Sequence, residues 1–237
     1  MHSAQLSEAD SKVLAQVFDP ETGPAKAEVL VDPTELKARE RDAIRLIEDY
    51  ENPATQSSQS RDEVYRKVLS LLDEIVADYP DYASARNNRA QLRRWRFGDR
   101  NMLCQARHSR ESDRSEAASA TLQDLRRSVA LASPERSHDA VSPAQGKLLA
   151  QAYTQLGAIY YAAAKDLEEA SDGEAVAEEL SGWTKDAIEE EASRMFYLGG
   201  LYGNEVAKAL AVHTNPHAKL CGNIVKEAMR KELAMRS

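Results

Sequence analysis

The stretch Asp81–Gly98, DYASARNNRAQLRRWRFG, decides the fold of this 237-residue chain. Five of its side chains recur at steps of three and four residues, the spacing of one helix face: Tyr82, Ala85, Asn88, Arg89 and Leu92. Pro80 ends the preceding segment, Asp81 is the predicted N-cap, and Gly98 with Asp99 provides the stop. The stretch is therefore predicted to be a single helix.

The rest of the chain carries further amphipathic segments with clear helix starts. Asp32–Glu35, Ser60–Glu63 and Ser142–Gln145 each place a capping side chain before an apolar run. Periodicity predicts helices over about 33–51, 60–78, 118–132, 142–165 and 183–198, a short one to Val212, and a last one from Asn215. With 10 Gly, 8 Pro and 6% aromatic residues, the composition is that of an all-helical protein, and only Val29–Val31 has an extended pattern.

The predicted helices pair into three hairpins, at 33–79, 81–132 and 142–198. The first helix of the second and third pairs looks like the A-helix of a tetratricopeptide repeat, where small residues let the paired helix approach. We therefore expect an all-α, tetratricopeptide-repeat-like solenoid over residues 33–214, with polar inserts at 100–117 and 166–182. Residues 215–237 are expected to form a helix that caps the open end of the stack.

Residues 1–32 form a predicted N-terminal extension. A short helix there places Val13, Leu14, Val17 and Phe18 on one face, before the breaker sequence DPETGP. A helix this short is marginal alone, so we expect it either to dock on the hairpins or to stay mobile.

Charge is unevenly distributed along the chain. The net charge of −8 argues against bulk binding of nucleic acid. Residues 86–114 nevertheless hold nine arginines against three acids, and residues 166–191 hold eleven acids against Lys185. Either these are two separate solvated surfaces, or the arginines form a patch that the acidic segment masks or that an acidic partner binds.

The expected compartment follows from two features of the sequence. No apolar run reaches the length of a membrane span, and residues 1–12 have no signal-peptide character. Cys104 and Cys221 do not suggest a disulfide framework. We expect reduced thiols and a cytoplasmic location, with a nuclear one left open.

No constellation of residues predicts chemistry. His217 and Cys221 lie one turn apart and could ligate a metal, but without a second pair nearby we expect an ordinary helix face and no metal. GGLYG (199–203) follows a helix, lacks a phosphate-loop lysine and is predicted to be a turn. The acids of Glu189–Glu191 are predicted to be a solvated helix start. We therefore expect no cofactor, no catalytic residue and no enzyme activity.

The first helices of the hairpins would expose one polar side to a concave groove that holds a partner polypeptide. The predicted groove residues are Arg41, Arg45, Ser84, Asn87, Asn88, Gln91, Arg94, Trp95, Gln151, Thr154, Gln155 and Tyr161. Trp95 and Tyr161 could be aromatic anchors, and the alternative for Trp95 is packing under the 100–117 insert. Tyr160 is expected in the core.

Three segments together resemble the tetratricopeptide repeat protein 36 family: VLAQVFDPETGP (13–24), ASARNNRAQLRR (83–94) and NPHAKLCGNIVKEAM (215–229). Their order and spacing also fit, and the two inserts are the departures. The resemblance implies a three-repeat helical protein that binds the Hsp70 chaperone and is linked in some members to tyrosine catabolism.

Repeats that grip chaperone tails hold both terminal carboxylates with Lys, Arg and Asn on successive A-helices. Asn88 matches the asparagine position, and Arg41 and Arg45 fall loosely on the first-repeat positions. Gln151 and Gln155 stand where the cations of the third repeat would be. The clamp is incomplete, so we predict that a free acidic tail is not bound in the standard way.

These observations favour a protein-binding adaptor or co-chaperone that holds a chaperone or client segment, without a membrane partner. The rival hypothesis is a scaffold whose 86–114 region contacts RNA or an acidic protein.

Overall fold

The computed structural model describes residues 34–55, 58–98, 112–136, 139–169, 177–216 and 226–232. Its main helices are α2 (Thr34–Glu51), α3 (Arg61–Asp78), α4 (Ala83–Arg96), α5 (Ser112–Ala132), α6 (Pro143–Glu169), α7 (Lys185–Leu201) and α8 (Glu205–Thr214). Short 3-10 turns occur at Pro53–Thr55 and Glu178–Leu180. These residues contain no strand, which confirms the predicted all-α class for the described part of the chain.

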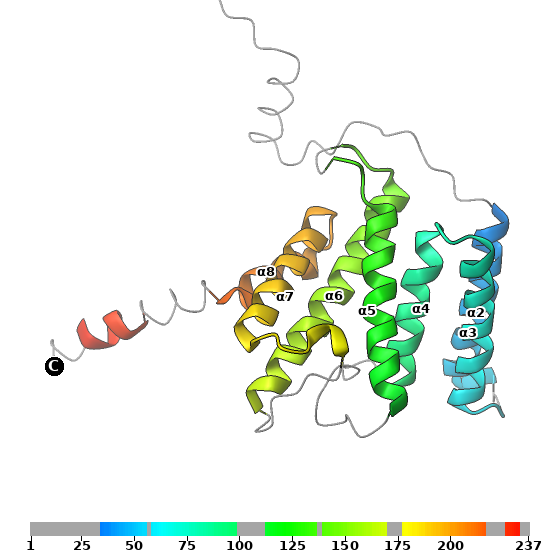
Figure 1. Cartoon of the computed structure of the whole chain (residues 1–237), viewed down its shortest axis with the longest axis horizontal. Helices are drawn as coiled ribbons and strands as arrows, with labels where there is room; N and C mark the ends of the chain where they lie inside the picture. Colours follow the sequence, from blue (N-terminus) through cyan, green and yellow to red (C-terminus); the bar gives the residue numbers. More distant parts are fainter. Residues whose placement is uncertain are drawn as a thin grey trace, which may run out of the picture.

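The helices pack one against the next in chain order, from α2 and α3 at one end to α7 and α8 at the other (Figure 1). Successive helices run in opposite directions, so α2/α3, α4/α5 and α6/α7 form the three predicted hairpins. The architecture is a helical-repeat-like stack, with α8 as the last packed helix. None of the helices within these ranges is long and apolar enough to span a bilayer.

Local capping explains where the helices begin. The Ser60 hydroxyl accepts a hydrogen bond from the Glu63 backbone N–H, and the Ser60 N–H donates to the Glu63 carboxylate, as in a capping box. Ser142 and Gln145 exchange the same pair of bonds at the start of α6. Both starts were predicted and are confirmed. Tyr82 rather than Asp81 is the N-cap of α4, because the Asp81 carboxylate lies beside Arg127 instead.

Two apolar clusters form most of the core. One joins α2, α3 and α4 around Leu36, Val68 and Leu92, and the other joins α5, α6 and α7 around Leu125, Ile159 and Met195. Tyr160 belongs to the second cluster, as predicted, with 2% of its surface exposed. A third, smaller cluster packs α8 onto Phe196 of α7.

The predicted inserts are shorter than expected. Helix α5 already begins at Ser112, inside the 100–117 segment, because Arg114 and Ala117 are buried. Helix α6 continues to Glu169, past the expected end near Lys165, because Asp166 is buried as well. The GGLYG segment was predicted to be a turn, but Gly199–Leu201 still belong to α7 and the chain turns only at 202–204.

Several predictions lie outside the described residues. The N-terminal extension 1–32, the extended Val29–Val31 and the pair His217 and Cys221 are among them. Of the expected C-terminal capping helix, residues 226–232 are helical and exposed throughout, so this part buries no surface of the stack.

Candidate interaction surface

A buried acid lies at the centre of the predicted groove. Glu40 of α2 is 6% exposed, and its carboxyl oxygens accept hydrogen bonds from three side chains of the neighbouring hairpin. The Tyr82 hydroxyl donates at 2.7 Å, the Ser84 hydroxyl at 3.0 Å and the Asn88 amide at 2.9 Å. Ser84 and Asn88, both predicted to face a guest chain, therefore bind a carboxyl group of this chain and fasten α2 to α4.

A second polar junction joins α4 to α6. Asn87 is 1% exposed, and its side-chain oxygen accepts a hydrogen bond of 2.9 Å from the Gln155 amide. Arg94 in turn donates to the Gln155 side-chain oxygen at 2.8 Å. These three predicted groove residues thus come together, and their mutual hydrogen bonds hold two hairpins in register.

Four of the predicted residues remain exposed, and they lie beside these junctions. Gln91 follows Asn88 by three residues and Asn87 by four, so it lies between the contacts to α2 and α6 and is exposed. Gln151 lies one turn before Gln155 and is also exposed. On α2, buried Leu36 and Ala43 lie to one side of Glu40, and exposed Arg41 and Arg45 lie to the other.

We call this surface the polar face; it comprises Arg41, Arg45, Gln91, Gln151 and Lys147, which precedes Gln151 by one turn. Within the described residues no ion pair involves Arg41, Arg45 or Lys147. The polar face therefore presents cations and amides to solvent, beside the polar junctions of Glu40 and Gln155.

The remaining predicted groove residues serve the fold. Trp95 donates a hydrogen bond to Glu51, meets Tyr50 edge-on and lies under the Arg61 guanidinium. It is neither an open anchor nor, within the described residues, packed under the insert. Thr154 bonds to the Ala150 carbonyl and accepts from Asn204, and Tyr161 is half-buried against the core.

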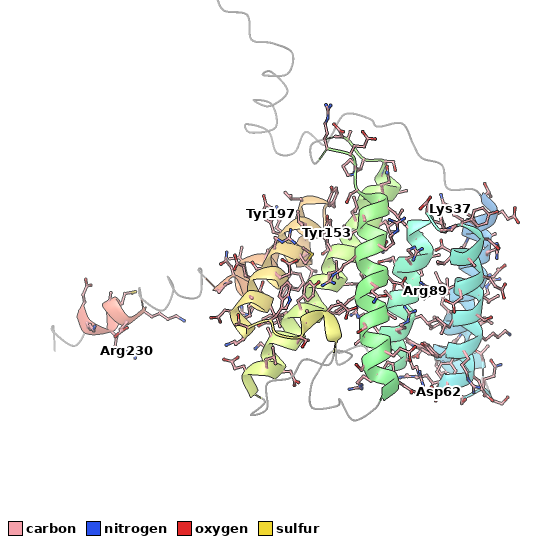
Figure 2. All side chains as sticks on the ribbon, in the orientation of Figure 1. Lys37, Asp62, Arg89, Tyr153, Tyr197 and Arg230 are labelled. Carbon is pink, nitrogen blue, oxygen red and sulfur yellow. The ribbon has the colours of Figure 1, made fainter. Side chains whose placement is uncertain are left out.

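The arginines of α4 point mainly inward. Asp124 of α5 is 3% exposed and receives Arg89 through two hydrogen bonds of 2.7 and 2.6 Å, with Arg93 bonded to the same carboxylate and Arg86 close by. Figure 2 labels Arg89 in the middle of the stack. Burial of Arg89 opposes its charge, yet the hydrogen bonds to Asp124 and Asp73 outweigh it and raise the pKa of Arg89.

These contacts show, for the described residues, whether the arginine-rich segment 86–114 pairs with the acidic segment 166–191. Arg86, Arg89, Arg93 and Arg96 pair with Asp124, Asp73 and Asp62, and not with the acidic segment 166–191. Arg100, Arg107 and Arg110 lie outside the described residues. The described arginines therefore give little support to a surface that contacts RNA. The prediction of a solvated Glu189 was wrong, because Glu189 is 6% exposed in the core side of α7.

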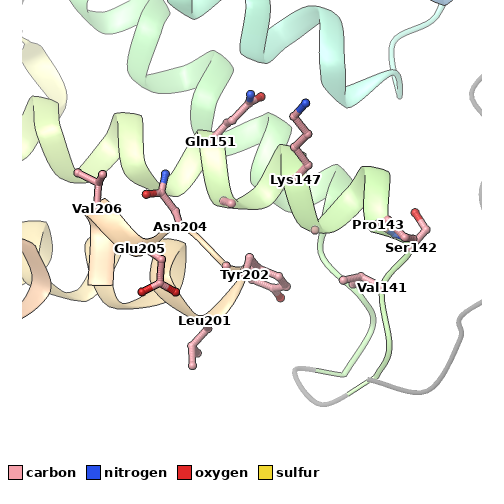
Figure 3. Close-up of a pocket in the computed structure, with 13 residues that line it drawn as sticks. Val141, Ser142, Pro143, Lys147, Gln151, Leu201, Tyr202, Asn204, Glu205 and Val206 are labelled. Carbon is pink, nitrogen blue, oxygen red and sulfur yellow. The ribbon is translucent and has the colours of Figure 1, made fainter. Parts of the chain in front are cut away.

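A surface hollow adjoins the polar face at Gln151. It has a volume of about 1180 Å³ and lies between the first turns of α6 and the α7–α8 turn (Figure 3). Its apolar lining comprises Val141, Pro143, Ala150, Leu201, Tyr202 and Val206, and we call it the α6–α8 hollow. Lys147 and Gln151 border it on one side and Glu205 on the other. Burial raises the pKa of Tyr202 above its ordinary value, so its hydroxyl stays neutral.

Sequence reasoning missed Glu40, Asp124 and the α6–α8 hollow. A carboxylate at a position where the helix period requires an apolar residue is the available signal for the first two. Leu201 and Val206 gave no such signal, because single exposed apolar residues are common.

Comparison with known proteins gives one close relative to report. The chain is 36% identical over 251 residues to a protein of Aspergillus fumigatus described as L-tyrosine degradation gene cluster protein hmgX. The similarity covers 96% of this chain and 93% of the relative. No family model matches the chain, and no solved structure matches it.

Proposed function

The chain belongs to the family of the L-tyrosine degradation gene cluster protein hmgX, and we propose from this premise that it serves L-tyrosine degradation as a protein-binding adaptor. In this proposal the protein catalyses no reaction itself. It acts in the cytoplasm, where Cys104 and Cys221 stay reduced.

The observation that carries the proposal is the polar face. Three successive first helices, α2, α4 and α6, expose Arg41, Arg45, Gln91 and Gln151 beside the hydrogen-bonded junctions that hold these helices together. The helices that carry these side chains are already fixed by the junctions, so a guest does not have to order the backbone of its binding surface. Its cations and amides suit an extended segment with acidic side chains and free backbone groups.

The polar face favours an internal segment of a client over a chaperone tail. Asn88, the residue that would grip a terminal carboxylate, already donates to Glu40. Gln151 and Gln155 supply no cation, and Gln155 is occupied by Asn87 and Arg94. The family resemblance to tetratricopeptide repeat protein 36 supports a co-chaperone role with Hsp70, and in this proposal such a contact uses another mode than the standard clamp.

The test compares two charge reversals in the tagged full-length chain. Arg41→Glu with Arg45→Glu changes the polar face, and Arg66→Glu with Lys67→Glu makes the same change on the exposed side of α3. Proteins that copurify from cells degrading L-tyrosine are quantified by mass spectrometry. We expect the polar-face variant to lose its guest by about tenfold or more, since two charge-assisted contacts are removed, and the α3 variant to retain it.

The same variants are introduced into cells that lack the chain, and consumption of L-tyrosine is measured. The α3 variant should restore it and the polar-face variant should not. Equal partners and equal consumption for both variants would contradict the proposal.

A further inference from the structure

The α6–α8 hollow exposes apolar side chains to solvent. Leu201 and Val206, which line it, are 62% and 65% exposed. A single soluble chain rarely leaves a contiguous apolar hollow open to water, because covering it removes the apolar area from solvent. Its wall also includes Tyr202, whose ring stacks on Tyr153 and is held in place.

The sequence of the N-terminal extension predicts an apolar helix face. Val13, Leu14, Val17 and Phe18 fall on one side of a short predicted helix. Six residues cannot hold a helix in water, so the segment 13–18 gains order only by packing on another surface.

The position of Thr34 allows this segment to reach the hollow. Helix α2 begins at the same end of the stack as the start of α6 and the α7–α8 turn (Figure 1). At 8–10 Å per helix contact, the hollow lies roughly 30 Å from α2 along the row α2, α4, α6 and α8. The connector 19–33 spans up to roughly 50 Å when extended.

Charge favours the same path. The connector 19–33 holds four acids, Asp19, Glu21, Glu28 and Asp32, against Lys26. The polar face, where Arg41, Arg45 and Lys147 are exposed, lies on α2, α4 and α6, the row of helices that leads from Thr34 to the hollow. An acidic strand over these cations gains favourable electrostatic contacts.

We propose that residues 13–18 occupy the α6–α8 hollow of their own chain, with the connector 19–33 lying across the polar face. The free protein then covers its own interaction surface, and a guest displaces the connector. The docking of residues 13–18 does not depend on the proposed function, whereas the displacement of the connector by a guest rests on it.

A pair of disulfide-forming variants tests the docking in the full-length chain. In a Cys104→Ser, Cys221→Ser background, Phe18→Cys is combined either with Val206→Cys in the hollow or with Val212→Cys. Both valines lie on α8 and are similarly exposed, at 65% and 71%, but Val212 faces a different groove, between α7 and α8. The disulfide is allowed to form by mild oxidation and is assigned by intact mass and peptide mapping, since it requires Cα atoms within about 7 Å.

We expect at least about fivefold more intramolecular disulfide with Val206→Cys than with Val212→Cys, since docking raises the effective concentration at the hollow alone. Arg41→Glu with Arg45→Glu should lower that yield. Covalent dimers linked through Val206→Cys would overturn the proposal in favour of a second copy as occupant. Equal yields at both valines, or none, would overturn it as well and leave the hollow to another protein.

A second measurement uses the otherwise wild-type chain. Val17→Glu should speed hydrogen exchange of residues 201–206 by about threefold or more, because it removes the covering segment. Val17→Glu is outside the described stack, and an unchanged helical circular dichroism spectrum confirms that the stack still folds. Unchanged exchange at residues 201–206 would overturn the docking. Partner capture is not a readout here, so this inference and the adaptor proposal can fail separately.

Discussion

The carboxylate of Asp124 forms ion pairs with the guanidinium groups of Arg86, Arg89 and Arg93. Arg86, Arg89 and Arg93 lie on successive turns of α4. The carboxylate of Asp124 on α5 bridges Arg89 and Arg93 and so sets the register of the second hairpin. The excess of positive charge is tolerable because Asp73 provides a second acceptor for Arg89 at 2.7 Å.

Asp124→Asn should therefore destabilise the protein by about 3–5 kcal/mol, because it leaves buried cations without their counter-charge. Urea unfolding followed by circular dichroism measures the change. Asp81→Asn removes a carboxylate that pairs with Arg127 at the surface, where Asp81 is 84% exposed. This control should cost no more than about 0.5 kcal/mol, and equal losses for the two variants would show that the cluster is not the anchor.

The hydrogen bond from Asn88 to Glu40 leads to a prediction about which peptides the protein binds. A peptide that ends in two acidic residues should bind more weakly than about 1 μM, because Asn88 is engaged and the clamp lacks cations in α6. Fluorescence anisotropy measures this, with the C-terminally amidated peptide as control. Submicromolar binding that amidation abolishes would show that the standard clamp operates after all.

Periodicity alone predicted which sides of the helices are buried, but it could not say which polar residues meet each other. Asn88 and Glu40 are 48 residues apart in sequence, and nothing local to Asn88 indicates a carboxyl partner. Of the six α4 positions predicted to line the groove, four therefore face inward to α2 or α6.

At the scale of elements, the close approach of α6 and α7 depends on Gly157. A Cβ atom added there would lie 2.8 Å from the Phe196 ring, which is fully buried and cannot move aside. Gly157→Ala should cost about 1–3 kcal/mol despite the better helix propensity of alanine.

The matched control is Gly146→Ala in the same helix. Its Cβ would meet only Val141, at an ordinary 3.7 Å. This variant should be neutral or stabilise by up to about 1 kcal/mol. Thermal unfolding compares the two, and a stabilised Gly157→Ala protein would show that α6 and α7 can separate at little cost.

The capping box of α3 predicts a pH dependence. Backbone and side-chain hydrogen bonds from Ser60 lower the pKa of Glu63 below its ordinary 4.5. The folded state thus favours the ionised form, and this contribution is present above the ordinary pKa and is lost as the pH falls through the lowered value. The stability difference between wild type and Glu63→Gln should be full at pH 7 and smaller at pH 3. A difference that stays constant over this range would mean that Glu63 does not take part.

Helix starts were predictable because their signals are local, and helix ends were not. Ser60 and Ser142 each form a capping hydrogen bond with the residue three positions later, and this short pattern predicts the starts of α3 and α6. The early start of α5 and the late end of α6 depend instead on burial of Arg114 and Asp166 by distant segments. The local sequence pattern does not predict burial by segments that are distant in the chain.

At the scale of the molecule, the stack has two main cores joined through polar junctions at α4. The α5–α7 core includes the most extensive helix pair, α6 and α7, whereas the α2–α4 core is smaller and ends at an exposed face of α2. Repeat stacks of this kind open from their weaker end.

Native-state hydrogen exchange should therefore show amides of α2 and α3 exchanging about tenfold faster or more than those of α6 and α7. Mass spectrometry of peptic fragments resolves the two halves. Glu40→Gln, which weakens the bonds that fasten α2 to α4, should widen the gap, while Asp139→Asn at an exposed position should not. Identical exchange in both halves would indicate a single cooperative unit.

The carboxyl group of Glu40 also takes the place of a partner's carboxylate. It accepts hydrogen bonds from the Asn88 amide, which would bind the terminal carboxylate of another protein, and from the hydroxyl groups beside it. We therefore expect proteins with acidic ends to be excluded for lack of a free amide donor, without any steric clash, and a partner to bind the neighbouring cations instead.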